Sequence, residues 1–282
     1  MAVLLLAPAA GADQAAPRPG DWSPPAPAQA PQLSAPTPLV RLRLQRTATR
    51  YQVWADNLVA GPVQVRLSLQ GDGSGVVAAP PLPLQKLIQA RASLVLGQLI
   101  LADPQGAMDF RLGLDAVPGD PQAQPLDVAY RLPFDAPVRV DQGPGGHFSH
   151  DDAQNLDAID FALIEGTPVL AARDGLVMQV EADHAQAGLD RERDAGRANF
   201  VRILHGDGSM ALYAHLAPAG VLVRPGQLVR AGDRIGLSGN TGLSTAPHLH
   251  FVVQVNRGMR LVSIPVRLLG PEGELRLPDP EP

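Results

Sequence analysis

Apolar and polar residues alternate along several short segments in the first half of the chain. This period of two is typical of strands with one buried face, and residues 39–44, 63–69 and 110–114 follow it. A glycine-rich turn at residues 71–73 is one of the breaks between these segments. Residues 38–135 are therefore predicted to form a β-sandwich-like domain.

One segment of that domain has an ambiguous pattern. Residues 84–88, Leu-Gln-Lys-Leu-Ile, fit a helical turn as well as a strand. Elsewhere helical patterns are few, and residues 158–162, 210–216 and 248–251 are apolar runs of strand type. The chain is therefore predicted to be mainly β, with a second domain over residues 136–270.

The two ends of the chain differ in composition from these domains. Residues 1–12 are apolar and end in Ala10-Gly11-Ala12, which is typical of a signal peptide and its cleavage site. Residues 13–37 are rich in proline and alanine and are predicted to be a linker. Residues 271–282 are predicted to be an exposed tail. A signal peptide would make the protein periplasmic or secreted.

Composition narrows the classes of function. A formal net charge of −5 does not fit a nucleic-acid-binding protein, which usually has a basic face. The apolar run at the N-terminus is too short to span a bilayer as a helix, so no stable membrane insertion is expected. The chain has no cysteine, which excludes a disulfide framework and a thiolate zinc site.

The candidate chemistry lies in the strands of the second domain. His248 and His250 are two residues apart on one predicted strand, so both side chains point to the same face. Asp160 lies between apolar residues, where a carboxylate is costly to bury unless it is paired or binds a metal. His150 precedes that strand, and His215 ends another. Imidazole and carboxylate groups are the ligands of catalytic zinc.

These residues belong to an ordered series of motifs across residues 141–265. The series resembles the lysostaphin-type, LytM-like zinc metallopeptidase family of peptidoglycan endopeptidases. It consists of Asp141-Gln142-Gly143 with Ser149-His150, Ala158-Ile159-Asp160-Phe161, Gly166-Thr167-Pro168-Val169, Ala171-Ala172-Arg173-Asp174-Gly175, Leu212-Tyr213-Ala214-His215-Leu216, Gly239-Asn240-Thr241-Gly242 and Pro247-His248-Leu249-His250-Phe251. The resemblance implies that the second domain is a LytM-like antiparallel β-sheet catalytic domain.

The resemblance also implies roles for single residues. His150, Asp160 and His250 match the zinc ligands, and His215 and His248 match the catalytic histidines that do not bind the metal. Either of these two could be the general base, and a zinc-activated water would attack the scissile amide with their help. The compact family spacing H-x-x-x-D would place the first ligand at Leu156, which has no donor atom.

The first ligand therefore has more than one candidate. Some relatives have a longer loop after a Ser-His pair, and His150 with nine residues before Asp160 fits that pattern. His147 is the alternative first ligand, and Asp157 is the alternative carboxylate. Of the other histidines, His184 is predicted to lie in a solvated loop, and His205 is predicted to lie in a hairpin turn before Asp207-Gly208.

Two functions remain open, with peptidoglycan stem peptides as the partner in both. The first is a zinc endopeptidase that cuts peptide cross-links of the cell wall. The second is a non-catalytic protein of the same fold that binds peptidoglycan or activates an amidase. The N-terminal domain could bind a protein regulator. Residues 168–177 and 229–233 also resemble strands of lipoyl and biotinyl carrier domains, which need an attachment lysine in a hairpin tip. The only lysine of the chain, Lys86, lies far from these residues, so a carrier function is excluded.

Overall fold

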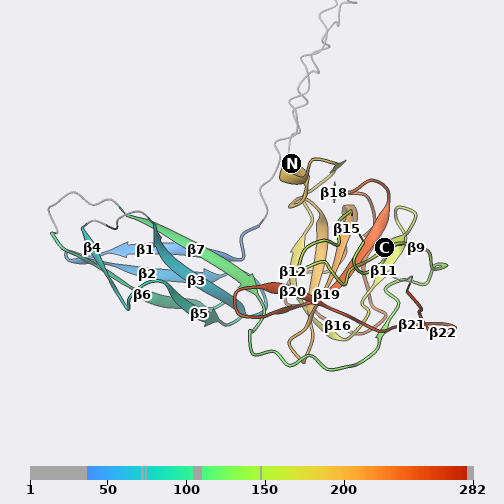
Figure 1. The fold of residues 1–282 in the computed structure, drawn as a ribbon, viewed down its shortest axis with the longest axis horizontal. Coiled ribbons are helices and arrows are strands. Elements are labelled where there is room, and N and C mark those ends of the chain that lie inside the picture. The colour runs from blue at the N-terminus through green and yellow to red at the C-terminus, as the bar shows by residue number, and fades with distance from the viewer. Residues whose placement is uncertain (1–36, 71–72, 74, 104–109, 147, 278–282) are drawn as a thin grey trace, which may run out of the picture. The chain divides into compact units, whose positions relative to one another are not determined.

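The computed structural model describes residues 37–70, 73, 75–103, 110–146 and 148–277. These residues belong to one compact unit, and its strands are drawn in Figure 1. The predicted signal peptide, nearly all of the predicted linker and the last five residues lie outside the described part. The predicted mainly β fold is confirmed.

The first half of the chain forms two small sheets that share a core. A four-stranded sheet has the order β1-β2-β6-β4, and a three-stranded sheet has the order β5-β3-β7. Alternate residues of facing strands, such as Val53, Val65 and Leu99, are buried together in one apolar cluster. The strands are β1 (Val40–Arg46), β2 (Arg50–Asn57), β3 (Val63–Gln70), β4 (Val76–Ala79), β5 (Leu84–Ile88), β6 (Ser93–Leu101) and β7 (Arg111–Pro118).

The ambiguous segment is the strand β5, so the helical-turn alternative is wrong. Its residues pair antiparallel with β3, from Val63 opposite Ile88 to Leu67 opposite Leu84. Leu84 and Ile88 are the buried ends of the segment. A five-residue apolar pattern cannot distinguish the two periods, and the backbone bonds offered by β3 decide between them.

The second half is built on one large, mostly antiparallel sheet. Its main path has the order β16-β12-β14-β15-β19-β10-β9, and β11, β17 and β20 pair at its sides. These strands are β9 (Val140–Gln142), β10 (Ile159–Ala162), β11 (Pro168–Leu170), β12 (Gly175–Glu181), β14 (Asn199–Leu204), β15 (Met210–Val221), β16 (Leu228–Val229), β17 (Arg234–Ser238), β19 (His248–Asn256) and β20 (Leu261–Ile264).

Short elements complete this half. Strands β13 (Ala187–Gly188) and β18 (Gly242–Leu243) form a parallel pair, and β8 (Tyr130–Arg131), β21 (Leu268–Gly270) and β22 (Gly273–Glu274) form a third small sheet. The helix α1 (Arg191–Asp194) begins after Asp190, whose side chain accepts hydrogen bonds from two backbone N–H groups of its first turn. No helix in the described part is long and apolar enough to cross a membrane.

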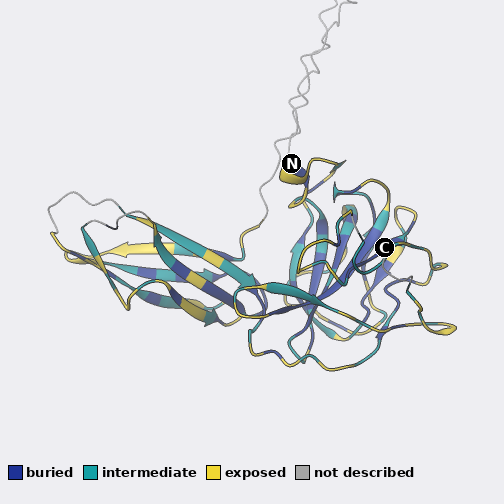
Figure 2. Cartoon of the chain, viewed as in Figure 1, coloured by how far each residue is buried: buried dark blue, intermediate teal, exposed yellow. Residues whose placement is uncertain are grey.

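The central strand β19 separates a core face from a polar face. Leu249, Phe251 and Val253 are fully buried in the main apolar cluster. His248, His250 and Gln254 alternate with them and therefore point to the other side of the sheet. Buried residues follow β15 and β19 in Figure 2. The strand period alone thus places the candidate site on the face of the sheet opposite the core.

The sheets of both halves are in direct contact. Met178 on β12 and Met210 on β15 belong to the apolar cluster of the first half. The backbone of Ala60 donates to the carbonyl of Met178 at 2.9 Å, and the Asn256 side chain donates to the carbonyl of Gly119 at 3.1 Å. After Gly270, residues 271–274 are exposed, whereas Leu275 and Leu277 pack against the main core, so the predicted tail is structured as far as Leu277.

Candidate metal and catalytic site

Strand register brings the predicted site residues of three strands together. Asp160 on β10 lies opposite His250 on β19. Ala214 on β15 lies on the other side of His250, so the next residue, His215, reaches the same place. His250 Nδ1 is 2.9 Å from Asp160 Oδ1, and His248 Nε2 is 3.8 Å from the same oxygen.

His150 reaches this cluster from the loop before β10. Its side chain is fully buried, and its Nδ1 lies 2.7 Å from the carbonyl oxygen of Gly143. A carbonyl can only accept, so Nδ1 carries the proton and Nε2 of the neutral ring has a free lone pair. That Nε2 is buried without a hydrogen-bond partner among the described residues, 3.3 Å from Asp160 Oδ1.

This arrangement fits a metal ion. A lone pair and a carboxylate oxygen cannot hydrogen-bond each other, but a cation between them satisfies both. Donor atoms of His150, Asp160 and His250 lie within 4.8 Å of one another. Four ligands at about 2.0–2.1 Å from zinc are about 3.3 Å apart in a tetrahedron, close to the 3.3 and 2.9 Å seen from Asp160 Oδ1. The group offers two nitrogens and one oxygen, which is a donor set of catalytic zinc sites.

The alternative ligands differ in what the structure says of them. His147 lies outside the described residues. Asp157 is bound to Ser263 instead. Its carboxylate accepts a hydrogen bond from Ser263 Oγ at 2.8 Å, and its backbone N–H donates to Ser263 Oγ at 3.0 Å.

His215 and His248 lie side by side at the edge of the cluster. Their ring centroids are 4.4 Å apart, and His215 is 5.9 Å from the ring of His250. His215 Nδ1 donates to the carbonyl of Thr241 at 2.7 Å, and His248 Nδ1 donates to that of Ala246 at 2.8 Å. These bonds fix the tautomer of each ring and leave Nε2 as the atom with a lone pair.

His215 is positioned by a β-bulge. Asn199 pairs with Leu216 while Phe200 pairs with Ala214, so His215 is an extra residue in β15. Its φ of 61° lies in the left-handed region, which is costly for a residue other than glycine. A bulge changes the direction of a side chain. Here it turns the imidazole of His215 toward His248 and His250.

A buried amide supports this bulge. The Asn199 side chain donates to the carbonyls of Leu216 and Ala217 at 3.3 and 3.2 Å, and it also bonds the backbone of His184. Thr241 Oγ1 donates to the carbonyl of Leu216 at 2.8 Å. The sequence contains the motif around Thr241, but it does not show that the Thr241 carbonyl accepts a hydrogen bond from His215. Only the folded chain brings the two segments together.

The electrostatics of the cluster follow from burial and from its mixed charges. Burial raises the pKa of Asp160, but the imidazoles of His150 and His250 beside its carboxylate outweigh that effect and lower the pKa well below its usual range. Burial lowers the pKa of His150, whereas the adjacent carboxylate of Asp160 and the carbonyl of Gly143 raise it, and the net shift is upward. Desolvation and the neighbouring His248 and His250 lower the pKa of His215 to about 3.

The remaining histidines lie outside this cluster. The prediction of a solvated loop for His184 is wrong, because its side chain is buried 3.9 Å from Glu181 and its backbone is bonded to Asn199. The hairpin prediction for His205 is confirmed: it precedes the turn between β14 and β15, and its backbone bonds Ser209. Charge-rich composition around His184 suggested exposure, but tertiary packing covers it.

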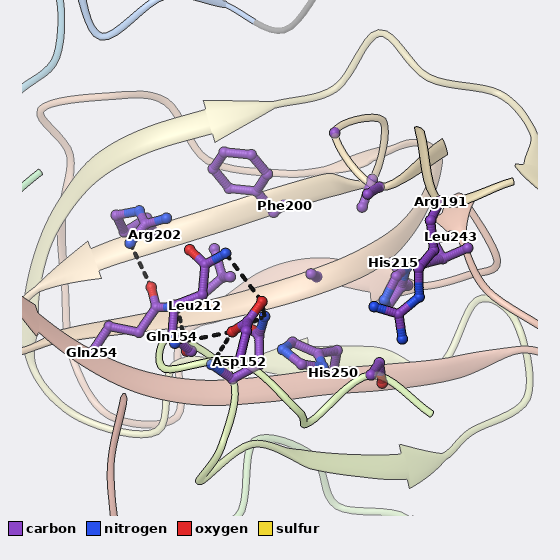
Figure 3. Close-up of a pocket in the computed structure, with 16 residues that line it drawn as sticks. Asp152, Gln154, Arg191, Phe200, Arg202, Leu212, His215, Leu243, His250 and Gln254 are labelled. Atoms are coloured by element: carbon purple, nitrogen blue, oxygen red, sulfur yellow. Dashed lines mark hydrogen bonds between the residues drawn. The ribbon is translucent and has the colours of Figure 1, made fainter. Parts of the chain in front are cut away.

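A groove of about 470 Å³ extends from the cluster over the polar face of the sheet. Its lining includes His215 and His250 at the cluster and, farther along, Leu212, Arg202 and Gln254 (Figure 3). The cluster therefore opens onto a space that can hold a short peptide, with apolar and polar side chains along its floor.

Comparisons with known proteins find similarity in the part of the chain that carries this cluster. Residues 154–261 match the model of peptidase family M23. The peptidoglycan DD-endopeptidase ShyA of Vibrio cholerae is 38% identical over 124 residues, which are 43% of this chain and 26% of that protein. The DD-carboxypeptidase/endopeptidase Mpg of Neisseria meningitidis is 37% identical over 114 residues, which are 40% of this chain and 23% of that protein.

A solved structure is also similar to part of this chain. The catalytic domain of lysostaphin from Staphylococcus simulans is 33% identical, and the match covers 42% of this chain and 81% of that chain with a TM-score of 0.31. This chain spans only about a quarter of the length of the two curated relatives. The family model itself matches residues 154–261.

Proposed function

We propose that this chain is a zinc-dependent endopeptidase that hydrolyses peptide cross-links of bacterial peptidoglycan, because residues 154–261 match the model of peptidase family M23. The observation that supports this most is His150 Nε2, a buried atom without a hydrogen-bond partner among the described residues, 3.3 Å from Asp160 Oδ1. Buried polar atoms are nearly always paired, so such a pair of acceptors needs a cation.

We assign His150, Asp160 and His250 as the residues that hold the metal. When bound, zinc supplies Lewis-acid chemistry, since it polarises a carbonyl and acidifies water. The carbonyl of Gly143 fixes the ring of His150 through Nδ1, and Asp160 is held between the two ligand histidines. A preformed set of this kind binds a metal with little rearrangement.

We assign His215 and His248 as the catalytic histidines. Backbone carbonyls hold the proton of each ring on Nδ1, so each Nε2 can accept a proton from a nucleophilic water. Once protonated, the same Nε2 can donate a hydrogen bond that stabilises charge on the scissile carbonyl. Proton transfer by a positioned side chain contributes about 10²–10⁴-fold to a rate. The ring centroids are 4.4 Å apart and the ring planes are tilted by 40°, so a substrate at the cluster meets both rings.

The substrate assignment rests on the relatives named above. A DD-endopeptidase acts on bonds between stem peptides, and the groove beside the cluster can hold such a peptide. Peptidoglycan lies outside the cytoplasmic membrane, which agrees with the signal-peptide pattern at residues 1–12 and a periplasmic or secreted protein. For the β-sandwich of the first half, we propose a role in docking substrate or a protein regulator.

The function is tested by digesting purified sacculi with the purified protein, with and without a chelator. We expect cross-linked dimers to disappear, stem-peptide monomers to appear in the mass spectrum, and the chelator to stop both. Sacculi left unchanged by folded, zinc-loaded protein would contradict the enzyme and favour the non-catalytic peptidoglycan-binding or amidase-activating alternative.

The ligand assignment is tested separately by metal analysis. His150→Ala is expected to lose bound zinc, whereas His147→Ala is expected to keep it. The reverse result would make His147 the first ligand.

A further inference from the structure

A buried arginine lies on the floor of the groove. Arg202 on β14 is 8% exposed, and its Nη1 donates to Gln254 Oε1 at 2.7 Å. Its Nε is buried without a hydrogen-bond partner, and within the described part of the chain no carboxylate pairs with it. Burial without a compensating anion lowers the pKa of Arg202 to about 10, and the group remains charged at neutral pH.

Such an arginine is costly for a folded protein. An unpaired buried cation loses its hydration without a gain in return. Of the charged residues that line the groove, Asp152 accepts hydrogen bonds from the amides of Gln154 and Asn155, and Arg191 contacts Asp151 and the carbonyl of Phe148. Neither neutralises Arg202, whose aliphatic and aromatic neighbours include Phe200 at 6.0 Å from the guanidinium carbon.

Its hydrogen bonds leave one edge of the guanidinium for a ligand. Gln254 is itself fixed, because its Nε2 donates to the backbone carbonyl of Gln154 at 2.8 Å, and it occupies Nη1. No described residue bonds Nη2 or the buried Nε, so a ligand in the groove would meet the guanidinium at Nη2. The edge formed by Nη2 and Nε has the fork geometry that matches both oxygens of a carboxylate.

The sheet register gives the distance to the candidate catalytic site. Phe200, Ala214 and His250 form one row across β14, β15 and β19, and Arg202 lies one row along, opposite Leu212. Two residues along a strand and two strands across correspond to about 12 Å between backbone positions. A peptide cut at the cluster would thus place a group within a few residues of the scissile bond over Arg202 (Figure 3).

We propose that Arg202, held by Gln254, is a specificity residue that binds a free carboxylate of the peptide substrate. The inference rests on the proposed endopeptidase function, and it adds that the substrate is recognised by a negative charge near the scissile bond. Stem peptides carry such free carboxylates. The substrate carboxylate supplies the negative charge that the described residues do not provide next to the Arg202 guanidinium.

The test uses synthetic cross-linked stem peptides in which each free carboxylate is replaced, one at a time, by a carboxamide. Wild-type protein is expected to lose about 10- to 100-fold in kcat/KM on one of these amides. Arg202→Met is expected to lose a similar factor on the free acid but nothing further on that amide. Arg202→Lys should recover part of the loss, and Arg224→Met, at an exposed position in the same half, should behave as wild type.

A purely structural role gives a different pattern. It would reduce activity on the acid and the amide equally and lower the thermal midpoint of Arg202→Met, and either result would overturn the proposal. Replacing a buried, unpaired charge by an apolar side chain is expected to leave that midpoint unchanged or raise it. The amide series can be measured on wild-type protein without any variant. If wild-type protein cuts every amide as fast as it cuts the free acid, the proposal is also overturned.

A binding measurement separates this inference from the proposed function. Calorimetric titration with an uncleaved stem tripeptide and its amides does not depend on turnover. We expect about 10-fold weaker binding to Arg202→Met than to wild type for the free acid, and equal binding for the relevant amide. If wild-type protein cuts no cross-link but shows this difference, only the endopeptidase assignment fails; cutting without any such difference overturns only the role of Arg202.

Discussion

The two β-rich halves of the molecule differ in how their buried polar side chains are hydrogen-bonded. In the first half, Asn57 is buried, and its side chain bonds the carbonyls of Gly61, Ile88 and Gln89 and the backbone N–H of Val59. In the second half, seven buried side-chain atoms of the described residues have no hydrogen-bond partner, and all lie between residues 150 and 256. None lies in β1–β7.

The difference separates polar groups that stabilise a fold from those that can bind a ligand. Asn199 shows that the large sheet also satisfies buried amides completely where they hold the backbone. His150 Nε2, on the loop before β10 and beside His250, and Arg202 Nε, on β14, have no hydrogen-bond partner among the described residues, and both His250 and Arg202 line the groove. Two of the seven unpaired buried atoms of the described residues, His150 Nε2 and Arg202 Nε, thus lie at the candidate site.

The largest expected effect comes from removing a proposed metal ligand. His250→Ala should reduce bound zinc from about one per chain to none and lower kcat/KM by at least about a thousandfold, because the Lewis-acid contribution is worth several kcal/mol. Elemental analysis and sacculus digestion measure both. Asp157→Asn is the matched control and should keep zinc, since Asp157 is bonded to Ser263. If His250→Ala kept its zinc, the buried polar cluster of the second half would not be the metal site, and the contrast with the first half would fail.

A smaller effect is expected when a catalytic histidine is removed and the ligands stay. His248→Ala should keep zinc and lower kcat by about 10²–10⁴-fold, because the ring moves a proton and does not hold the metal. Full activity in this variant would refute the catalytic assignment of His248.

The pH dependence of stability sharpens the contrast for a histidine buried outside the cluster. Burial lowers the pKa of His205 from 6.5 to about 4. Between these values the unfolded chain binds a proton that the folded chain does not, so the free energy of unfolding should fall as pH falls from about 6.5 to 4. The loss approaches about 3 kcal/mol below pH 4. Urea unfolding of wild type and His205→Asn measures it, and parallel pH profiles would contradict the expectation.

The smallest of these effects tests the first half alone. Asn57→Ala leaves several buried backbone groups unpaired and should reduce the free energy of unfolding by about 2 kcal/mol. Zinc content and activity of the folded fraction should not change. Denaturant unfolding and metal analysis measure these quantities, with Arg66→Ala, which removes an exposed ion pair, as the control. Loss of zinc in Asn57→Ala would show that the first half shapes the metal site.

The sequence predicted the strands and the candidate residues better than their surroundings. Alternation along residues 248–251 was enough to place His248 and His250 on one face, and the structure sets Asp160 beside them. The sequence could not reveal the bulge at His215, because the bulge depends on a register shift between β14 and β15. Nor did it reveal the burial of His184 and Arg202, because their cover comes from segments distant in the chain.

The most direct test of the central claim is anomalous diffraction at the zinc edge from crystals of the zinc-loaded protein. We predict one strong peak bounded by His150 Nε2, Asp160 Oδ1 and His250 Nδ1, and no comparable peak among the strands of the first half. Zinc-saturated crystals without a peak at these three atoms would contradict the account.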